Sequence, residues 1–467
     1  MNKKVISLLL TSLFVLTIFV GHVSTAGDGG QQMPSHSTSL AEGSGLRRAS
    51  DGSVLLNELR QNGSYKSTGI ATSVPHAGAS GMQAPRGSKA QHDLISFVNC
   101  PFFVRCRCQS NDPTYYANTP AQLHRWNPLS SQWEKIRDGT TNTDGLVEFL
   151  GLKESKPGIY DYTVSCRGNY SKPFETLITY PVIFVHGWDG SSTEMLRLYQ
   201  WPWTDITQAL DNAGFVKNRD YFIYNYNTKD DPRTAADGLQ NFIKEKKMFF
   251  HAQYQYDDSK FTIVCHSMGA LVTRWCIERE GGAENVVQWI GIGPTSHGSA
   301  LDDIAPDLLF IFNPLTSKPF EQTRTDSDTV KGLDDPNFGA KGLARNVTYR
   351  VIVGNNTNNV KGFGYDMAGL PAVIFLNGKT WARLPGCTGP SQRCHYRTLR
   401  GDGLVANVQS WIDCADFQSF TGLSHLGLNH NRTVINYVLR CIENPNTRGQ
   451  KVGLDNFLYP NDPDAPH

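Results

Sequence analysis

The stretch that decides the fold is Phe261-Thr262-Ile263-Val264-Cys265-His266-Ser267-Met268-Gly269-Ala270. An apolar, β-branched run enters a serine, and the residues after it follow a helical pattern. A serine between a strand and a helix is typical of a nucleophile elbow, a sharp turn that projects the hydroxyl from the carboxyl edge of a sheet. Small residues on either side of the serine let the strand and the helix approach each other. Gly269 meets this requirement, and Cys265 stands where the usual motif has its first glycine.

Apolar strand runs and helical patterns alternate on both sides of this stretch. Residues 182–185 and 287–292 are further buried runs. The helical pattern after Ser267 places its apolar residues on one face: Leu271, Val272, Trp275 and Cys276. Strands separated by helices favour a parallel sheet. The sequence therefore predicts an α/β domain with a mostly parallel central sheet over residues 180–467.

Two later segments contain an acid and a histidine in loops that include glycine. Residues 401–403 read Gly-Asp-Gly, and residues 423–428 read Leu-Ser-His-Leu-Gly-Leu. The chain order Ser267, Asp402, His425 is the order expected when a Ser-Asp-His triad is built on such a sheet. The separate matches in this order predict a catalytic triad.

The run at 182–185 leads into His186-Gly187-Trp188. A loop after an early strand of such a sheet supplies a backbone N–H to a developing oxyanion, together with the N–H of the residue after the nucleophile. We expect the N–H groups of Trp188 and Met268 to form the oxyanion hole.

These segments, together with residues 290–299, resemble the secreted bacterial-type triacylglycerol lipases and esterases of the α/β-hydrolase superfamily. The resemblance spans about Tyr180 to Arg440, with gaps. It implies Ser267 as the nucleophile, His425 as the general base and then acid, and Asp402 as the carboxylate that orients His425. The implied reaction is hydrolysis of carboxylic esters, of lipids above all, through an acyl-enzyme.

Other histidines and acids compete for roles near this site. His430 lies in a loop that also resembles the histidine loop of some lipases, although the pattern around His425 matches better. We expect His186 and His266 to organise the oxyanion loop and the elbow, and His297 to be structural. Some relatives bind calcium, and the acids to consider here are Asp189, Asp302 and Asp303. Because no cluster of oxygen ligands is evident, the sequence predicts no metal and no cofactor.

The same triad serves several reactions, so the residues leave the substrate open. A phospholipase, a thioesterase or an acyltransferase would use it equally, whereas a non-enzymatic binding member of the fold would be expected to have lost a triad residue or the oxyanion glycine. Residues 308–312, in the insertion between Gly298 and Asn346, are apolar. They predict either a cap wall for an acyl chain or an ordinary buried segment, and residues 370–376 are a second candidate wall.

The N-terminus has the order of a secretory signal peptide. Lys3 and Lys4 precede an uncharged apolar run over residues 5–20 and the small residues 24–26. We expect a signal peptide over residues 1–26 and therefore a secreted, extracellular protein; an uncleaved anchor is the alternative. No later segment is long and apolar enough to cross a membrane. Residues 27–92 are rich in Gly, Ser, Ala and Gln, which predicts a flexible linker or a propeptide.

Residues 93–179 predict a small, all-β, sandwich-like domain. The runs at 94–98 and 160–164 are strands, and an Asp-Gly turn and an alternating strand lie between them, over residues 141–149. A Pro-Gly turn at 157–158 follows, so the pattern predicts a meander. It resembles the transthyretin-like and carboxypeptidase-regulatory-like sandwiches. An all-β extension of another topology is the alternative.

Charge and cysteine content narrow the partners. The formal net charge is +1, so we expect no nucleic-acid partner, but a lipid or ester substrate that could be met at a lipid–water interface. Ten cysteines in a secreted chain favour disulfides. Cys387 and Cys394 could pair locally, Cys414 and Cys441 flank the C-terminal segment, and four more cluster near the N-terminus: Cys100, Cys106, Cys108 and Cys166. The connectivity stays open.

Overall fold

The computed structural model describes residues 46–48, 54–56, 68–74, 91–108, 114–187, 203–228, 230–300, 303, 318–355, 379–382 and 397–453. The predicted signal peptide, the oxyanion residue Trp188 and the two candidate cap segments, 308–312 and 370–376, lie outside these residues.

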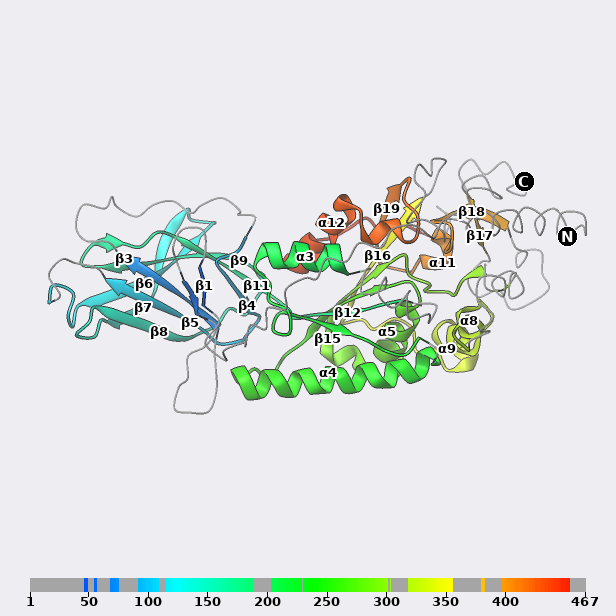
Figure 1. Cartoon of the computed structure of the whole chain (residues 1–467), viewed down its shortest axis with the longest axis horizontal. Coiled ribbons are helices and arrows are strands. Elements are labelled where there is room, and N and C mark those ends of the chain that lie inside the picture. Colours follow the sequence, from blue (N-terminus) through cyan, green and yellow to red (C-terminus); the bar gives the residue numbers. More distant parts are fainter. Residues whose placement is uncertain are drawn as a thin grey trace, which may run out of the picture. The chain divides into compact units, whose positions relative to one another are not determined.

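The first part of the chain contains two β-sheets that share one core (Figure 1). Val104 and Phe149 from the first sheet meet Leu123 and Val164 from the second, which confirms the predicted all-β, sandwich-like region. The first sheet has the order β1 (Leu46–Arg48), β2 (Val54–Leu56), β3 (Thr68–Val74), β5 (Phe102–Cys108), β8 (Leu146–Leu152). The second has the order β4 (Leu94–Phe97), β11 (Phe174–Thr179), β9 (Gly158–Cys166), β6 (Pro120–Asn127), β7 (Gln132–Thr140), with β10 (Asn169–Tyr170) paired to β9.

The predicted meander is wrong. β8 pairs with β5, whereas β9 pairs with β6 and β11 in the other sheet. The turn at Pro157-Gly158 therefore carries the chain across the sandwich instead of joining neighbouring strands. Alternation identifies the residues that face a core, but both sheets face the same core, so it does not assign a strand to a sheet.

The β-region also begins earlier than the predicted boundary at residue 93. β3 lies within the segment predicted to be a linker, runs parallel to β5 from Thr68↔Phe102 to Val74↔Cys108, and buries Ile70. Its sequence, TGIATSV, has few large apolar side chains. Because its side chains bury little apolar surface, β3 depends on backbone pairing with β5 for its stability.

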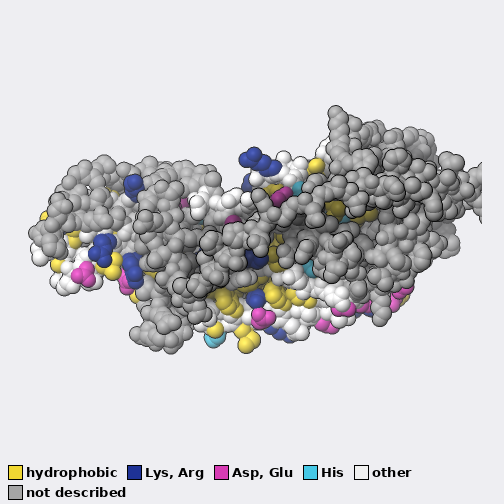
Figure 2. Space-filling model, viewed as in Figure 1, with side chains coloured by type: hydrophobic (Ala, Val, Ile, Leu, Met, Phe, Trp, Pro, Cys, Tyr) yellow, Lys and Arg dark blue, Asp and Glu magenta, His cyan; other side chains and the backbone are white. Residues whose placement is uncertain are grey.

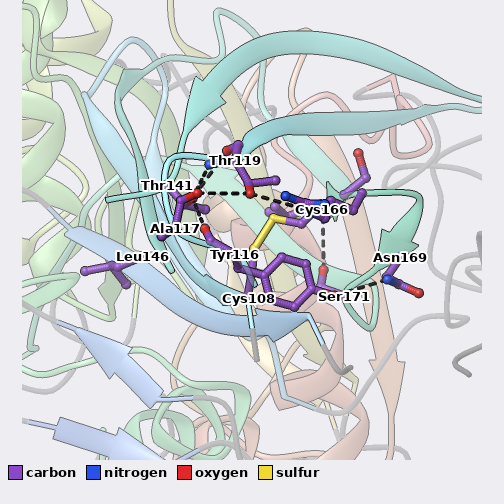
Figure 3. The surroundings of a disulfide bond; sticks show 12 residues. Cys108, Tyr116, Ala117, Thr119, Thr141, Leu146, Cys166, Asn169 and Ser171 are labelled. Atoms are coloured by element: carbon purple, nitrogen blue, oxygen red, sulfur yellow. Dashed lines mark hydrogen bonds between the residues drawn. A yellow bond between two sulfur atoms is a disulfide. The ribbon is translucent and has the colours of Figure 1, made fainter. Parts of the chain in front are cut away.

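A disulfide joins the two sheets of the β-region. Cys108 at the end of β5 is bonded to Cys166 at the end of β9 (Figure 3). Beside it, the Thr119 N–H donates to Thr141 Oγ1 over 2.8 Å, and Asn169 Nδ2 donates to Tyr116 Oη over 3.1 Å. Outside this disulfide, Cys100, Cys265, Cys276, Cys414 and Cys441 are free in the described ranges. The suggested Cys387–Cys394 pair lies outside the described residues.

The second part of the chain is built on a parallel sheet. Its order is β13 (Tyr221–Tyr224), β12 (Val182–Val185), β14 (Phe261–His266), β15 (Val286–Ile292), β16 (Thr348–Asn355), β19 (Asp416–Thr421), and every neighbouring pair is parallel. The three predicted strands are confirmed as β12, β14 and β15. The predicted fold class, an α/β domain with a mostly parallel central sheet after an all-β region, is therefore confirmed.

Helices cover both faces of this sheet (Figure 1). Val182 and Phe184 pack with α3 (Thr204–Ala213) and α12 (Arg432–Glu443), whereas Ile183 and Val185 pack with α4 (Pro232–Tyr254) and α5 (Gly269–Glu278). A strand covered on both faces is apolar at successive positions, as the run Val-Ile-Phe-Val is. Side-chain caps fix the starts of two helices: Asp231 accepts the N–H of Arg233, and Asn431 accepts that of Thr433.

The edge formed by β4 and β11 is buried on both faces. From β4, Leu94 enters the sandwich core, whereas Ile95 and Phe97 enter the cores of the α/β part. The β11 neighbours divide in the same way, since Ile178 faces the sandwich and Leu177 faces the α/β part. Two strands of the sandwich thus contribute core residues to the rest of the chain.

None of the helices in the described ranges has both the length and the apolar character needed to cross a membrane.

The remaining elements are short. The short elements are η1 (Gly282–Asn285), α8 (Lys318–Thr323), α9 (Asp328–Asp334), η2 (Pro336–Phe338), β17 (Lys379–Ala382), β18 (Arg397–Arg400), α11 (Asn407–Ser410) and η4 (Gly427–Asn429).

Candidate active site

Ser267 occupies a sharp turn between β14 and α5. Its φ is +54°, in the left-handed region that side chains other than glycine rarely adopt. Two glycines make room for the turn. A Cβ on Gly187 would lie 2.6 Å from the Cβ of Ser267, and a Cβ on Gly269 would lie 2.5 Å from the carbonyl oxygen of His186. Strain held at one serine by close backbone approach is what an elbow requires.

The loop after β15 fixes the backbone of this turn. The Ser267 N–H donates to the Ile292 carbonyl over 3.2 Å. The Ser267 carbonyl in turn accepts the N–H of Thr295 over 3.3 Å and its hydroxyl over 3.2 Å. Cys265, where the motif has its first glycine, packs its side chain into the core that includes α4 and α5. A cysteine suffices there because its side chain points away from the elbow into packed residues.

Asp402 and His425 form a buried hydrogen-bonded pair. His425 Nδ1 lies 2.8 Å from Asp402 Oδ2, and both residues are 1% exposed. Asp402 Oδ1 accepts the N–H groups of Leu404 over 3.1 Å and Val405 over 2.8 Å. The His425 N–H donates to the Asp402 carbonyl over 2.9 Å. The Asp402 carboxylate can only accept a hydrogen bond, so Nδ1 of His425 must carry the proton when the ring is neutral. Nε2 is then the basic nitrogen of the ring.

That second nitrogen is the unusual feature of the pair. His425 Nε2 is buried and has no hydrogen-bond partner among the described residues. A buried polar atom without a partner is costly, so it marks either a functional position or a place for water. In a triad, this nitrogen faces the nucleophile.

Close contacts bring Ser267 and the Asp402–His425 pair to the same edge of the sheet. Ile292, whose carbonyl binds Ser267, is followed by Gly293, where a Cβ would lie 3.0 Å from His425 Nδ1 and 3.1 Å from Asp402 Oδ2. His266, next to Ser267, places Nε2 3.2 Å from the His425 carbonyl oxygen. Sequence reasoning missed Gly293, although it stands at the end of a buried strand in the quoted segment 290–299.

The other histidines take different places. Burial, together with the neighbouring His425, lowers the pKa of His266 well below its usual value, so this ring stays neutral. The His186 ring stacks on Tyr226 with centroids 4.4 Å apart, and Tyr226 Oη donates to the His186 carbonyl over 2.9 Å. His430, the alternative base, places Nδ1 3.0 Å from Asp205 Oδ2 on α3. Asp402 therefore pairs with His425, not with His430.

His297 belongs to a partly buried ionic network. Its Nδ1 binds the Asp334 carboxylate, and its Nε2 lies 2.7 Å from the Trp411 carbonyl oxygen. Arg274 Nε donates to Glu278 over 2.8 Å, and Arg274 Nη1 donates to the Ser296 carbonyl over 2.6 Å. These bonds hold the loop that contains Thr295, the residue whose hydroxyl donates to the Ser267 carbonyl. Asp334 and Arg274 carried no sequence signal for this role.

The predicted oxyanion donors are only half described. Met268 is buried and caps the N-terminus of α5, where backbone N–H groups lack partners within the helix. Trp188 and the acids Asp189 and Asp302 lie outside the described residues. Asp303 accepts the Thr325 N–H over 2.8 Å. Within the described ranges, no group of three or more His, Cys, Asp or Glu residues is placed to hold a metal ion.

Comparison with known proteins gives one family match. The model of the lecithin:cholesterol acyltransferase family matches residues 185–301. These residues contain the elbow and the loop after β15, but neither Asp402 nor His425. No curated protein matches the chain.

Several solved structures are similar in part. The mature form of Bacillus licheniformis lipase BlEst2 is 16% identical, with 56% of this chain and 92% of that chain covered and a TM-score of 0.41. The phospholipase PlaB from Legionella pneumophila is 17% identical, with 60% and 62% covered and a TM-score of 0.37. Lipase 1 from Pelosinus fermentans is 14% identical, with 58% and 100% covered and a TM-score of 0.37.

The fold assignment rests on the topology. A parallel sheet with helices on both faces, a strained serine after β14 at its carboxyl edge and a close-packed glycine before the helix occur together here. The chain therefore has the α/β-hydrolase fold, preceded by a β-sandwich region.

Proposed function

We propose that the protein is a secreted serine hydrolase that cleaves carboxylic esters, with lipids as the substrate class, through Ser267, His425 and Asp402. The observation that carries the proposal is the unpartnered Nε2 of His425, on a ring whose other nitrogen is bonded to Asp402. Such a ring can accept a proton at Nε2, because no group in the described part of the chain already donates a hydrogen bond to that nitrogen.

The proposed mechanism is acyl transfer in two steps. His425 Nε2 takes the proton from Ser267 Oγ as that oxygen attacks the ester carbonyl carbon, and Asp402 stabilises the imidazolium that forms. The N–H of Met268, at the start of α5, and that of Trp188 hold the oxyanion. The imidazolium returns its proton to the departing alcohol. Water then attacks the acyl-enzyme by the same route and releases the acid and free Ser267.

The match to the lecithin:cholesterol acyltransferase family favours a second candidate, transfer of the acyl group to an alcohol. The first half-reaction is the same, and the acceptor decides the second. Secretion rests on the N-terminal pattern Lys3-Lys4 followed by an apolar run, and on the Cys108–Cys166 disulfide, because disulfides persist in oxidising compartments.

The test is hydrolysis of p-nitrophenyl esters, from short to long acyl chains, by the secreted protein and its Ser267→Ala variant. We expect the variant to lose activity by about a millionfold while its melting temperature stays within a few degrees. The chain-length profile separates a lipase from an esterase. Adding an alcohol acceptor and measuring the new ester separates hydrolysis from acyl transfer. Activity that survives in the variant would contradict the role of Ser267.

A further inference from the structure

The β6–β7 hairpin presents an apolar tip outside the α/β part. Trp126 and Trp133 face each other across the two strands, with ring centroids 5.5 Å apart at 69°. The loop between the strands carries Leu129, which is 96% exposed. We call Trp126, Leu129 and Trp133 the hairpin tip.

The tip is held in shape by polar contacts of its own. Asn127 Oδ1 accepts the N–H groups of Leu129 over 2.9 Å and Ser130 over 3.4 Å. Asn127 Nδ2 donates to Glu134 over 2.6 Å on the opposite strand. Such a turn needs its asparagine but makes no demand for an apolar residue at Leu129. Leu129 belongs to none of the hydrophobic cores of the described residues, so the fold itself does not explain an apolar residue there.

Two ion pairs lie near the tip. Arg125 lies 2.8 Å from Glu154, and Lys135 lies 3.0 Å from Asp138. On the face of the β-region that Figure 2 shows, the coloured side chains include hydrophobic, basic and acidic ones beside one another. A strongly charged partner would find no complementary field here. The partner that fits the hairpin tip is one with an apolar interior beneath a polar surface layer.

We propose that the hairpin tip inserts into the surface of the lipid phase that holds the ester substrate, with Leu129 in the acyl region and the two indoles at the headgroup level. Tryptophan favours that level because its ring is apolar and its N–H is polar. The choice of a lipid surface rests on the proposed function. A protein partner would bury about 1,200 Å² or more in a stable interface, which is more than one leucine and two half-buried indoles offer.

The geometry of the tip also favours lipid over carbohydrate. Sugars stack on open aromatic faces, whereas the two indoles here pack edge to face against each other. Leu129, the most exposed part of the tip, offers no hydrogen bond to a hydroxyl group.

The experiment is co-flotation of the full secreted chain with phosphatidylcholine vesicles. It is done in the Ser267→Ala background, so that binding is measured whether or not the protein is an esterase. Leu129→Asp should lower the partition coefficient by about 10- to 100-fold, because a charge replaces the leucine side chain that is proposed to enter the acyl region. Leu129→Phe should keep binding within a few-fold. Raising the salt concentration should leave wild-type binding unchanged, since the tip has no charge excess.

Met248 provides the matched control. It is 72% exposed on α4, in the α/β part, so Met248→Asp makes the same kind of change at another exposed apolar residue. We expect that variant to bind vesicles as the parent does. With Ser267 restored, Leu129→Asp should hydrolyse soluble p-nitrophenyl acetate normally and an emulsified triglyceride more slowly.

Three results would overturn the proposal. The parent chain could fail to float with vesicles, Leu129→Asp could float as well as the parent, or Met248→Asp could lose binding equally. Binding to an insoluble polysaccharide that depends on Leu129, without vesicle binding, would assign the tip to carbohydrate instead. If vesicle binding behaves as expected and no ester is cleaved, the tip stands and the proposed function fails.

Discussion

Two histidine–aspartate pairs, one buried and one partly buried, lie near the loop after β15, and they differ at the second ring nitrogen. His425 binds Asp402 through Nδ1 and leaves Nε2 without a partner in the described part of the chain. His297 binds Asp334 through Nδ1, but its Nε2 lies 2.7 Å from the Trp411 carbonyl oxygen. The residue types are the same in both pairs. A histidine with both ring nitrogens bonded to protein groups can hold a loop in place. Proton transfer to a substrate needs one ring nitrogen without such a bond.

The carboxylates are also held differently. Asp402 is bound by two backbone N–H groups in a tight loop. Asp334 is bound by side chains, with His297 on one oxygen and Arg274 Nη1 3.5 Å from the other. Burial would raise the pKa of Asp334, but the charges and hydrogen bonds of His297 and Arg274 outweigh it and hold this pKa below its usual value. We therefore expect the first pair to govern activity and the second to govern stability.

The largest expected difference is between the two histidines. His425→Ala should lower kcat on a p-nitrophenyl ester by about a millionfold, because the base is removed. His297→Ala should lower it by less than about a hundredfold, through the loop that clamps Ser267. Steady-state kinetics on both variants is the measurement. Equal losses would show that His297 takes part in the chemistry.

The aspartates should differ next. Asp402→Asn keeps the shape of the loop but favours the wrong tautomer of His425, so kcat should fall by about 10⁴-fold. Chemical denaturation should show little change in its free energy of unfolding. Raising the pH should not restore the rate if the tautomer is the cause. A strongly destabilised Asp402→Asn would instead place Asp402 among the structural carboxylates.

Asp334→Asn should show the reverse behaviour. The substitution leaves Arg274 with Glu278 as its carboxylate partner and removes the charged acceptor from His297, which costs about 3 kcal/mol of unfolding free energy near neutral pH. The lowered pKa fixes the sign of the pH dependence: the contribution of Asp334 is present above about pH 4, the ordinary range of an aspartate, and is lost as the pH falls. Urea unfolding at neutral and acid pH checks this. An equal difference between variant and wild type at both pH values would contradict it.

His92 is a further histidine that binds carboxylates, and it extends the comparison to a ring bound at both nitrogens. His92 Nδ1 binds Glu175 on β11, and its Nε2 lies 3.3 Å from Glu443 at the end of α12. Burial opposes a charge on this ring, but the hydrogen bonds and charges of the two glutamates outweigh it and raise the pKa of His92 to about 9. The ionic contribution of about 3 kcal/mol is therefore full below pH 6.5 and is lost as the pH rises to about 9.

His92→Gln tests that window. The stability advantage of the wild type over the variant should shrink between pH 6.5 and pH 9, whereas hydrolysis at neutral pH should stay within a few-fold. Thermal unfolding across this range is the measurement. A constant advantage at all pH values would mean that His92 acts through packing alone.

The parts of the molecule that local sequence determines were predictable. The run from Phe261 to Ala270 is strand, turn and helix in continuous sequence, so one reading gave the elbow and its orientation. Asp402 and His425 are 23 residues apart, yet each sits in a short glycine-containing pattern, and the order along the chain supplied the rest. The triad assignment itself stays a prediction until it is tested, as does the transthyretin-like resemblance of the β-region.

The parts that depend on long-range choices were not predictable. Asp334 and His297 are 37 residues apart, and an aspartate in a short helix looks like any surface acid. The sheet to which β8 or β9 belongs is decided by packing across the sandwich, which no local pattern records. β3 looks like a linker because its pairing partner β5 supplies much of its stability.

The two-sided burial of β4 and β11 limits how this chain can be divided. A module that evolution can exchange has to leave intact cores behind on both sides of the cut. Here the Phe97 ring lies 5.3 Å from that of Phe250 on α4, and Leu177 packs in the core that contains α3 and α12. Cutting the chain near residue 180 would expose these cores on both fragments. Calorimetry should therefore record one cooperative transition for both regions, because neither region keeps an intact core without the other.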